Sequence, residues 1–157
     1  MLDEKLYSPI KDSLEQRFRN AGFRDIYLEI TADGNFSRKL RDIFTLELRF
    51  MGRRFAPDLT GYARKSEQLY RITVEIKNKG LGFRELFQAK GYGELLDTKY
   101  AFLIGSHPLF STVREFLGQR RSLLYFGHPQ TRVLHIGRFN VRSNRLVDED
   151  WFPASPF

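Results

Sequence analysis

Two charged residues that can do chemistry together, Glu75 and Lys77, flank a single isoleucine at the end of an apolar stretch. Side chains two positions apart in a strand share a face, so this carboxylate and this ammonium would lie about 6.5 to 7 Å apart. Such a pair can hold a metal ion and a water molecule. The same pair can also lie on a solvated strand face, where the charges only offset each other, and Glu-x-Lys alone favours this second interpretation.

The strand that would carry the pair is predicted from strict alternation of apolar and mostly polar residues over 69–77. A second strand is expected over 57–62. It opens with a Pro-Asp pair, and proline suits the first residue of a strand. The polar stretch 63–68 between the strands has the length of a hairpin loop. Such a hairpin would bring Asp58 near Glu75, so that two carboxylates and a lysine converge.

These segments resemble the motifs of the PD-(D/E)xK nuclease superfamily: Pro57-Asp58, a hairpin, then Glu75-Ile76-Lys77 closing an apolar strand. Gln88 and Tyr92, four residues apart on an expected helix, are similar to the Q-x-x-x-Y element of its RecB-like and lambda-type exonuclease branch. The matching elements run from about residue 57 to 105, and the last third has no clear counterpart. The resemblance implies a restriction-endonuclease-like core of the α/β class (an α+β mixed sheet), in the order helix, three strands, helix, strand. A C-terminal strand extension would follow this core.

The resemblance also implies an activity, that of a metal-dependent deoxyribonuclease in DNA repair, recombination or end processing. Asp58, Glu75 and Lys77 would be the catalytic residues. Asp58 and Glu75 would bind Mg²⁺, or Mn²⁺, with the carbonyl of Ile76 as a further ligand, because hard cations favour oxygen donors. Lys77 would orient the attacking water or stabilise the transition state.

A first helix is predicted over residues 3–20 from apolar residues at spacings of four. We prefer a start at Ser8 as N-cap with Pro9 at the first helical position; the alternative is a longer helix that Pro9 kinks. Family members often place an acid of this helix beside the metal. The candidates are Glu4, Asp12 and Glu15, with Glu15 preferred because it lies inside the helix either way. Each is equally well explained as a solvated surface acid.

Basic residues point to a polyanionic partner, since the formal net charge is +7. Gln88 and Tyr92 would reach one place, where the resemblance implies contact with DNA or with the site residues; a buried polar pair is the alternative. Further predicted nucleic-acid contacts come from a glycine-containing loop, the following helix and a segment in which arginine and aromatic residues interleave. They are Lys79, Lys90, Arg120 and Arg121.

Composition limits the other possibilities. The 157 residues fit one domain, 1–157. With no cysteine, the chain has no disulfide, thiolate metal site or cysteine nucleophile, and it differs from the related branch that holds an iron-sulfur cluster. The sequence contains neither an apolar run of membrane-spanning length nor a signal peptide, so we expect a cytoplasmic protein with no membrane partner. DNA is the expected partner, RNA is not excluded, and a homo-oligomer is possible.

Two other functions remain open at this stage. The chain can be a catalytically silent nucleic-acid-binding module on the same fold. It can also be a basic α+β interaction domain with Glu75 and Lys77 exposed.

The remaining elements are predicted from local patterns. Strands are expected over 25–31, as an edge or an insertion, and over 43–50. A helix over 83–97 would turn Phe83, Phe87, Gly91 and Leu95 inward. After a buried strand over 99–105 come a helix over 108–118, a short strand over 123–126 and a strand over 132–139.

Overall fold

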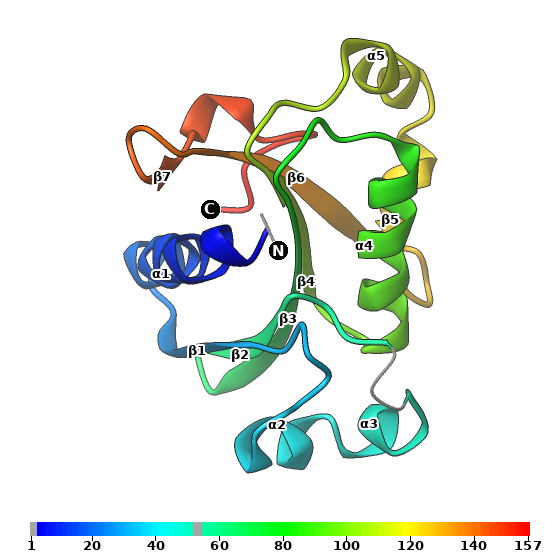
Figure 1. The fold of residues 1–157 in the computed structure, drawn as a ribbon. Coiled ribbons are helices and arrows are strands. Elements are labelled where there is room, and N and C mark those ends of the chain that lie inside the picture. Colours follow the sequence, from blue (N-terminus) through cyan, green and yellow to red (C-terminus); the bar gives the residue numbers. More distant parts are fainter. Residues whose placement is uncertain (1–2, 52–54) are drawn as a thin grey trace.

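The computed structural model describes residues 3–51 and 55–157, which form helices packed on both faces of one curved sheet (Figure 1). The strands are β1 (Arg24–Ile30), β2 (Leu59–Lys65), β3 (Gln68–Lys77), β4 (Tyr100–Gly105), β5 (Tyr125–Phe126), β6 (Arg132–Asn140) and β7 (Arg145–Leu146). The helices are α1 (Glu4–Asn20), α2 (Arg38–Ile43), α3 (Thr45–Met51), α4 (Phe83–Leu95) and α5 (Ser111–Gln119), with short 3-10 helices η1 (Arg121–Leu124) and η2 (Asp148–Asp150).

The sheet is mixed and, within the described residues, holds seven strands in the order β1-β2-β3-β4-β6-β5, with β7 paired to β6. β1, β2 and β3 are antiparallel neighbours, whereas β4 runs parallel to both β3 and β6. Parallel neighbours need a long crossover, and α4 supplies the one between β3 and β4. The predicted mixed α/β class is therefore confirmed, with β1 as an edge strand.

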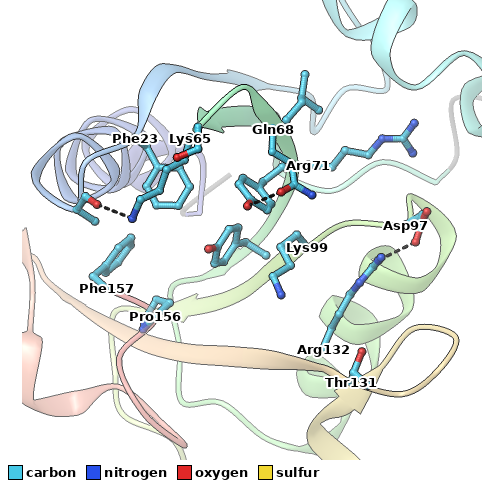
Figure 2. Close-up of a pocket in the computed structure, with 15 residues that line it drawn as sticks. Phe23, Lys65, Gln68, Arg71, Asp97, Lys99, Thr131, Arg132, Pro156 and Phe157 are labelled. Atoms are coloured by element: carbon cyan, nitrogen blue, oxygen red, sulfur yellow. Dashed lines mark hydrogen bonds and ion pairs between the residues drawn. The ribbon is translucent and has the colours of Figure 1, made fainter.

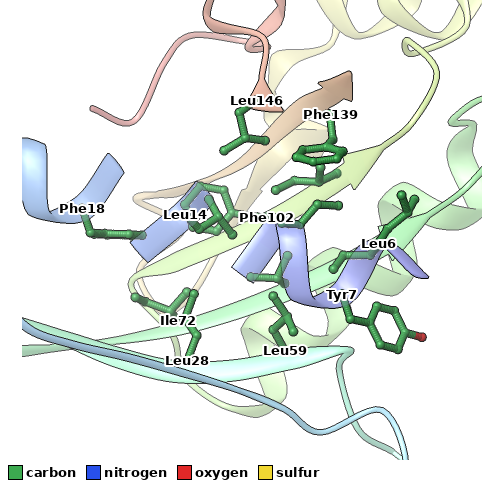
Figure 3. Close-up of a cluster of buried hydrophobic side chains, with 14 of the residues drawn as sticks. Leu6, Tyr7, Leu14, Phe18, Leu28, Leu59, Ile72, Phe102, Phe139 and Leu146 are labelled. Atoms are coloured by element: carbon green, nitrogen blue, oxygen red, sulfur yellow. The ribbon is translucent and has the colours of Figure 1, made fainter. Parts of the chain in front are cut away.

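The largest core lies between α1 and one face of the sheet (Figure 3). Leu14 and Phe18 of α1 are fully buried against Ile72 of β3 and Phe102 of β4. The buried residues recur every three or four positions on α1 and at every second position on the strands. The apolar patterns of helix and strand in the sequence therefore form one shared apolar layer. Tyr7 lies at one end of this layer, with its hydroxyl pointing out of it.

A second core covers the opposite face, where Leu86 and Ala89 of α4 pack with Leu103 of β4. This arrangement corrects the predicted inner stripe of α4. Phe83, Phe87 and Leu95 are exposed, and a Cβ added to Gly91 would meet nothing within 4 Å. The buried row runs instead through Glu85, Leu86, Ala89 and Gly93, because small side chains let the helix approach the sheet closely.

The C-terminal segment closes the first core. A Cβ on Gly137 would lie 2.6 Å from Trp151 Cζ3, so glycine is required for Trp151 to pack there. Phe152 exchanges two backbone hydrogen bonds of 2.8 Å with Ile136. The ring of Phe157 lies 5.1 Å from that of Phe18 in α1. The aromatic residues near the C-terminal end of the sequence therefore pack onto the domain.

Helix α1 starts at Glu4, so the preferred start at Ser8 is wrong and Pro9 lies inside the helix. Proline removes one backbone donor and crowds the preceding turn, at a cost of about 3 kcal/mol. Leu6 and Tyr7 are buried ahead of it and continue the apolar stripe. Their burial offsets the proline and extends the helix by a turn.

The predicted strand over 43–50 is also wrong, because Thr45–Met51 form helix α3. The alternating apolar residues Leu46 and Phe50 are 67% and 78% exposed, so no sheet face receives them. Phe44, between α2 and α3, is buried instead and packs with Tyr62 and Leu96 in a third cluster. The sequence also predicts a reversal of the chain at Met51-Gly52-Arg53 after this segment, and that stretch lies partly outside the described residues.

Candidate active site

Asp58 lies immediately before β2 and faces the end of β3. Leu59 pairs with Val74 in the antiparallel register, so the next residues along, Asp58 and Glu75, stand opposite each other. The hairpin that joins the strands is tighter than predicted: its turn has positive φ at Ser66 and Glu67, the geometry of a two-residue connection. The predicted approach of the two carboxylates is therefore confirmed.

Both oxygens of Asp58 have partners in the fold. Oδ1 accepts a hydrogen bond of 2.9 Å from the Tyr7 hydroxyl, and Oδ2 accepts one of 2.7 Å from the Ile76 amide. Asp58 is 9% exposed, and burying a charge without such donors would be strongly unfavourable. Ile76 thus enters the site through its N–H, while the predicted role of its carbonyl as a metal ligand stays a prediction.

Glu75 and Lys77 share a face of β3, as predicted, and their Oε1 and Nζ atoms lie 3.0 Å apart. Glu75 is only 3% exposed. The interpretation of this pair as a solvated strand face is excluded by that burial. The alternation that placed Ile72, Val74 and Ile76 in the α1 core leaves Glu75 on the opposite side, toward α4.

The ionisation of these groups is strongly perturbed. Burial, and then the negative charge of Asp58, raise the pKa of Glu75 to about 7, against the opposing effect of Lys77. Burial also raises the pKa of Asp58, although the Ile76 amide and Tyr7 oppose it. Burial alone would lower the pKa of Lys77, but the adjacent Glu75 outweighs it and raises that pKa. Burial and the mutual repulsion of the two acids therefore both disfavour their joint ionisation.

One atom of the site suits a divalent cation. Glu75 Oε2 is buried and has no hydrogen-bond partner within 3–51 and 55–157, and buried polar atoms in folded proteins normally have one. Two carboxylates are hard oxygen donors of the kind that Mg²⁺ prefers, and Mg²⁺ usually completes its shell with water. Across the described residues, no group of three or more His, Asp or Glu gathers as a metal site. A cation would thus depend on Asp58 and Glu75.

The acid that α1 brings to the site is Asp3, which the sequence analysis missed. Asp3 Oδ1 accepts a hydrogen bond of 2.7 Å from the Asn78 amide, just after Lys77, and its charge contributes to raising the pKa of both Asp58 and Glu75. An acidic residue just before a helix start could have identified Asp3, but a helix that starts at Ser8 excludes it.

The structure does not bring the preferred acid, Glu15, to the site. Its carboxylate accepts from Lys11 Nζ at 3.1 Å and from the Leu28 amide at 3.4 Å. Glu15 also lies eight residues beyond Tyr7, about 12 Å along the helix axis. The other two candidates, Glu4 and Asp12, are exposed.

Gln88 and Tyr92 meet on α4, as their spacing predicted. A side-chain hydrogen bond from Gln88 partly offsets the burial and the charge of Glu75, which together raise the pKa of Tyr92. Tyr92 is half-buried and Gln88 is exposed. The pair therefore connects the carboxylate site to solvent, and contact with DNA stays a prediction.

The predicted nucleic-acid residues differ in their freedom to bind. Lys79 Nζ lies 2.7 Å from Glu85 Oε1, and Lys90 Nζ donates to the Leu123 carbonyl at 3.0 Å. Both lysines therefore have roles within the fold. Arg120 and Arg121 are exposed, and the guanidinium of Arg120 lies 5.7 Å from the Phe116 ring centre.

Comparisons with protein-family models, curated proteins and solved structures found no match for this chain. The functional assignment therefore depends on the geometry of the chain itself. None of the helices in the described part of the chain has the length and apolarity that a bilayer crossing requires.

Proposed function

We propose that the protein is a metal-dependent nuclease that hydrolyses DNA phosphodiester bonds. The observation that carries the proposal is the buried meeting of Asp58, Glu75 and Lys77, in which Glu75 Oε2 has no hydrogen-bond partner among the described residues. Buried acids with raised pKa values beside a specific charge partner are typical of functional sites.

Asp58 and Glu75 would hold the metal. When bound, a divalent ion lowers the pKa of a coordinated water and neutralises charge on phosphoryl oxygens. Tyr7 and the Ile76 amide fix the orientation of the Asp58 carboxylate through their hydrogen bonds. Lys77 stays protonated beside Glu75, so its ammonium can orient an attacking water or stabilise negative charge on the phosphate. Gln88 and Tyr92 would contact the substrate where the site meets solvent.

The order of elements supports the same proposal. The chain runs through α1, β1, β2, β3, α4 and β4, which is the order helix, three strands, helix, strand of the PD-(D/E)xK nucleases that the sequence resembles. The insertion of α2 and α3 falls between β1 and β2, and the strands after β4 form an extension. Residues 57–58 lie just before β2, residues 75–77 end β3 and residues 88–92 lie on α4, which supports the proposal.

A catalytically silent binding module is the second candidate, favoured by one observation. Both oxygens of Asp58 and one oxygen of Glu75 already have protein partners. A site that satisfies its own acids in this way has less need of a metal. The positively charged chain would then hold nucleic acid without cutting it.

The test is cleavage of end-labelled single-stranded, duplex and branched DNA, with a matching RNA, in Mg²⁺ or Mn²⁺ and then in EDTA. We expect metal-dependent products with the unaltered protein and none with Glu75→Ala or Lys77→Ala. Glu115→Ala, an exposed change on α5, is the matched control and should cut normally. Circular dichroism of each variant checks that the fold is retained.

Undiminished cleavage by either site variant would refute the assignment of these residues. Salt-sensitive DNA binding without any metal-dependent product would instead favour the silent module.

A further inference from the structure

A second candidate site lies at the opposite end of β3. A pocket of about 1170 Å³ opens there between the β2–β3 turn, the start of β4, the start of β6 and the C-terminal residues (Figure 2). β3 enters this pocket at Gln68–Arg71 and reaches the carboxylates at Glu75. At about 3.3 Å per residue, the two sites are separated by much of the strand.

Aromatic rings form one wall of the pocket. The ring centres of Phe23 and Tyr70 lie 5.9 Å apart, those of Phe23 and Tyr100 also 5.9 Å, and those of Tyr70 and Tyr100 6.0 Å. These three side chains are half-buried, and Phe157, which also lines the pocket, is 38% exposed. Aromatic side chains that are not fully buried in a core leave ring surface on which a planar group can stack.

Cations surround this wall. Lys65 lies over the Phe23 ring at 5.0 Å and donates to the Ala21 carbonyl at 3.1 Å. Arg132 is held by Asp97 at 2.6 Å. Lys99 is exposed, points into the open space of Figure 2 and makes no ion pair with any described carboxylate. Arg71 also lines the pocket, but its guanidinium pairs with Glu47 Oε1 at 2.6 Å. Asp97 is the one acidic side chain among the lining residues, so Lys99 is the lining cation left for a ligand.

We propose that this pocket binds a nucleoside phosphate, with the base against the wall of Tyr70 and Tyr100 and the phosphate at Lys99. An apolar ligand would leave the cations unused, and a bare phosphate would leave the rings uncovered. Base stacking on aromatic rings combined with phosphate contact by lysine is how proteins hold single strands. The nucleoside phosphate can come from a free nucleotide or from a nucleic-acid strand, and the inference does not depend on hydrolysis at Glu75.

The experiment measures binding in EDTA, where metal-dependent cleavage does not occur. Fluorescence anisotropy follows a 5′-fluorescein oligothymidylate, and unlabelled ATP and dTMP compete with it. We expect Lys99→Glu to weaken binding about tenfold, because one phosphate contact becomes a repulsion. Tyr70→Ala should weaken binding about fivefold or more through lost stacking. The matched control, Arg38→Glu, reverses an exposed charge on α2 outside the pocket and should change affinity less than twofold.

The three probes distinguish a free nucleotide from a nucleic-acid strand as the ligand. Competition by ATP or dTMP that Lys99→Glu abolishes supports a free nucleotide. Oligothymidylate binding that Lys99→Glu weakens, without competition by either mononucleotide, supports a strand. Unchanged affinity for all three probes in Lys99→Glu, or no binding of any of them to the unaltered protein, overturns the proposal. Because Lys99 is on the surface, its variant should fold normally, and thermal unfolding verifies this.

Discussion

The two ends of β3 differ in the sign and in the burial of their charged side chains. At its C-terminal end, Glu75 is 3% exposed and pairs with Lys77, and the neighbouring Asp58 accepts two hydrogen bonds from the fold. At its N-terminal end, an open pocket is lined by basic side chains, of which Arg71 and Arg132 pair with acids. Its Lys99 has no acidic partner among the described residues. The acidic end is enclosed and the basic end is open.

The difference shows what each end requires from a ligand. Burial disfavours the ionised acids and raises their pKa values. A bound cation would therefore stabilise the ionised acids at this end. Lys99 is exposed, so its charge is hydrated and free to attract an anion to the basic end. The predictions below test whether the two ends behave in this way.

The largest effect is expected from Asp58→Asn. The amide can still accept from Ile76 and bond to Tyr7, so the fold should persist, but the site loses one of the two carboxylates that would hold the metal. We expect metal-dependent DNA cleavage to fall about a thousandfold or more, measured as initial rates in saturating Mg²⁺.

The matched change Asp12→Asn provides the control, because Asp12 is an exposed acid of α1. Its cleavage rate should stay within twofold of the unaltered protein. Equal rates for the two variants would remove Asp58 from the mechanism.

The next effect is on stability and depends on pH. The pKa of Glu75 is about 7 in the fold, above its ordinary value of 4.5, so the folded state holds the proton more tightly. Ionisation of Glu75 therefore lowers the free energy of unfolding as pH rises from 4.5 to 7, by up to about 3 kcal/mol. Glutamine cannot ionise, so Glu75→Gln removes this pH-dependent fall in the free energy of unfolding. In urea denaturation with EDTA, Glu75→Gln should gain stability relative to the unaltered protein between pH 5 and pH 8.

A stability difference between Glu75→Gln and the unaltered protein that is the same at every pH would contradict a raised pKa at Glu75. Added Mg²⁺ sharpens the measurement. It should raise the midpoint of thermal unfolding of the unaltered protein at pH 8 and leave that of Glu75→Gln nearly unchanged.

A smaller effect is expected from Tyr7→Phe. The ring still fills its place in the α1 core, but Asp58 Oδ1 loses its buried donor. We expect the free energy of unfolding at pH 7 to fall by about 2 kcal/mol, measured by urea denaturation. The matched change Tyr125→Phe, at an exposed position, should have almost no effect, and an equal loss in both variants would refute the role of the Tyr7 hydroxyl.

The smallest effect distinguishes two acids of the N-terminal region. Asp3→Asn weakens the contact that holds the Asn78 loop beside Lys77 and should lower the cleavage rate about fivefold, roughly the value of one hydrogen bond. Glu15→Gln should change it less than twofold, because Glu15 contacts Lys11 and the Leu28 amide instead. The opposite ranking would restore Glu15 as the acid that approaches the metal.

The parts predicted correctly from sequence are those fixed by local periodicity. Alternation in β3 set which side chains share a face, and the hairpin then put Asp58 opposite Glu75. Asp3 was missed because Pro9 suggested a later helix start, whereas the burial of Leu6 and Tyr7 decided it. Such burial is a tertiary effect that local patterns do not contain.

Two further features depended on packing between distant segments. The row at Phe83 and Phe87 has helical spacing, but small Gly93, whose added Cβ would lie 3.0 Å from both Ala101 and Phe126, determines which side of α4 approaches the sheet. The pocket draws its lining from residues as far apart as Ala21 and Phe157. No spacing within one segment predicts it.

The contact between Phe18 and Phe157 has a consequence for biosynthesis. Helix α1 is synthesised before the strands and the aromatic residues, among them Phe157, that cover its apolar side. Contacts between such distant positions form slowly. The hydrophobic surface of α1 therefore stays partly exposed during translation, and this nascent stage is when the protein is most open to aggregation or to capture by a chaperone.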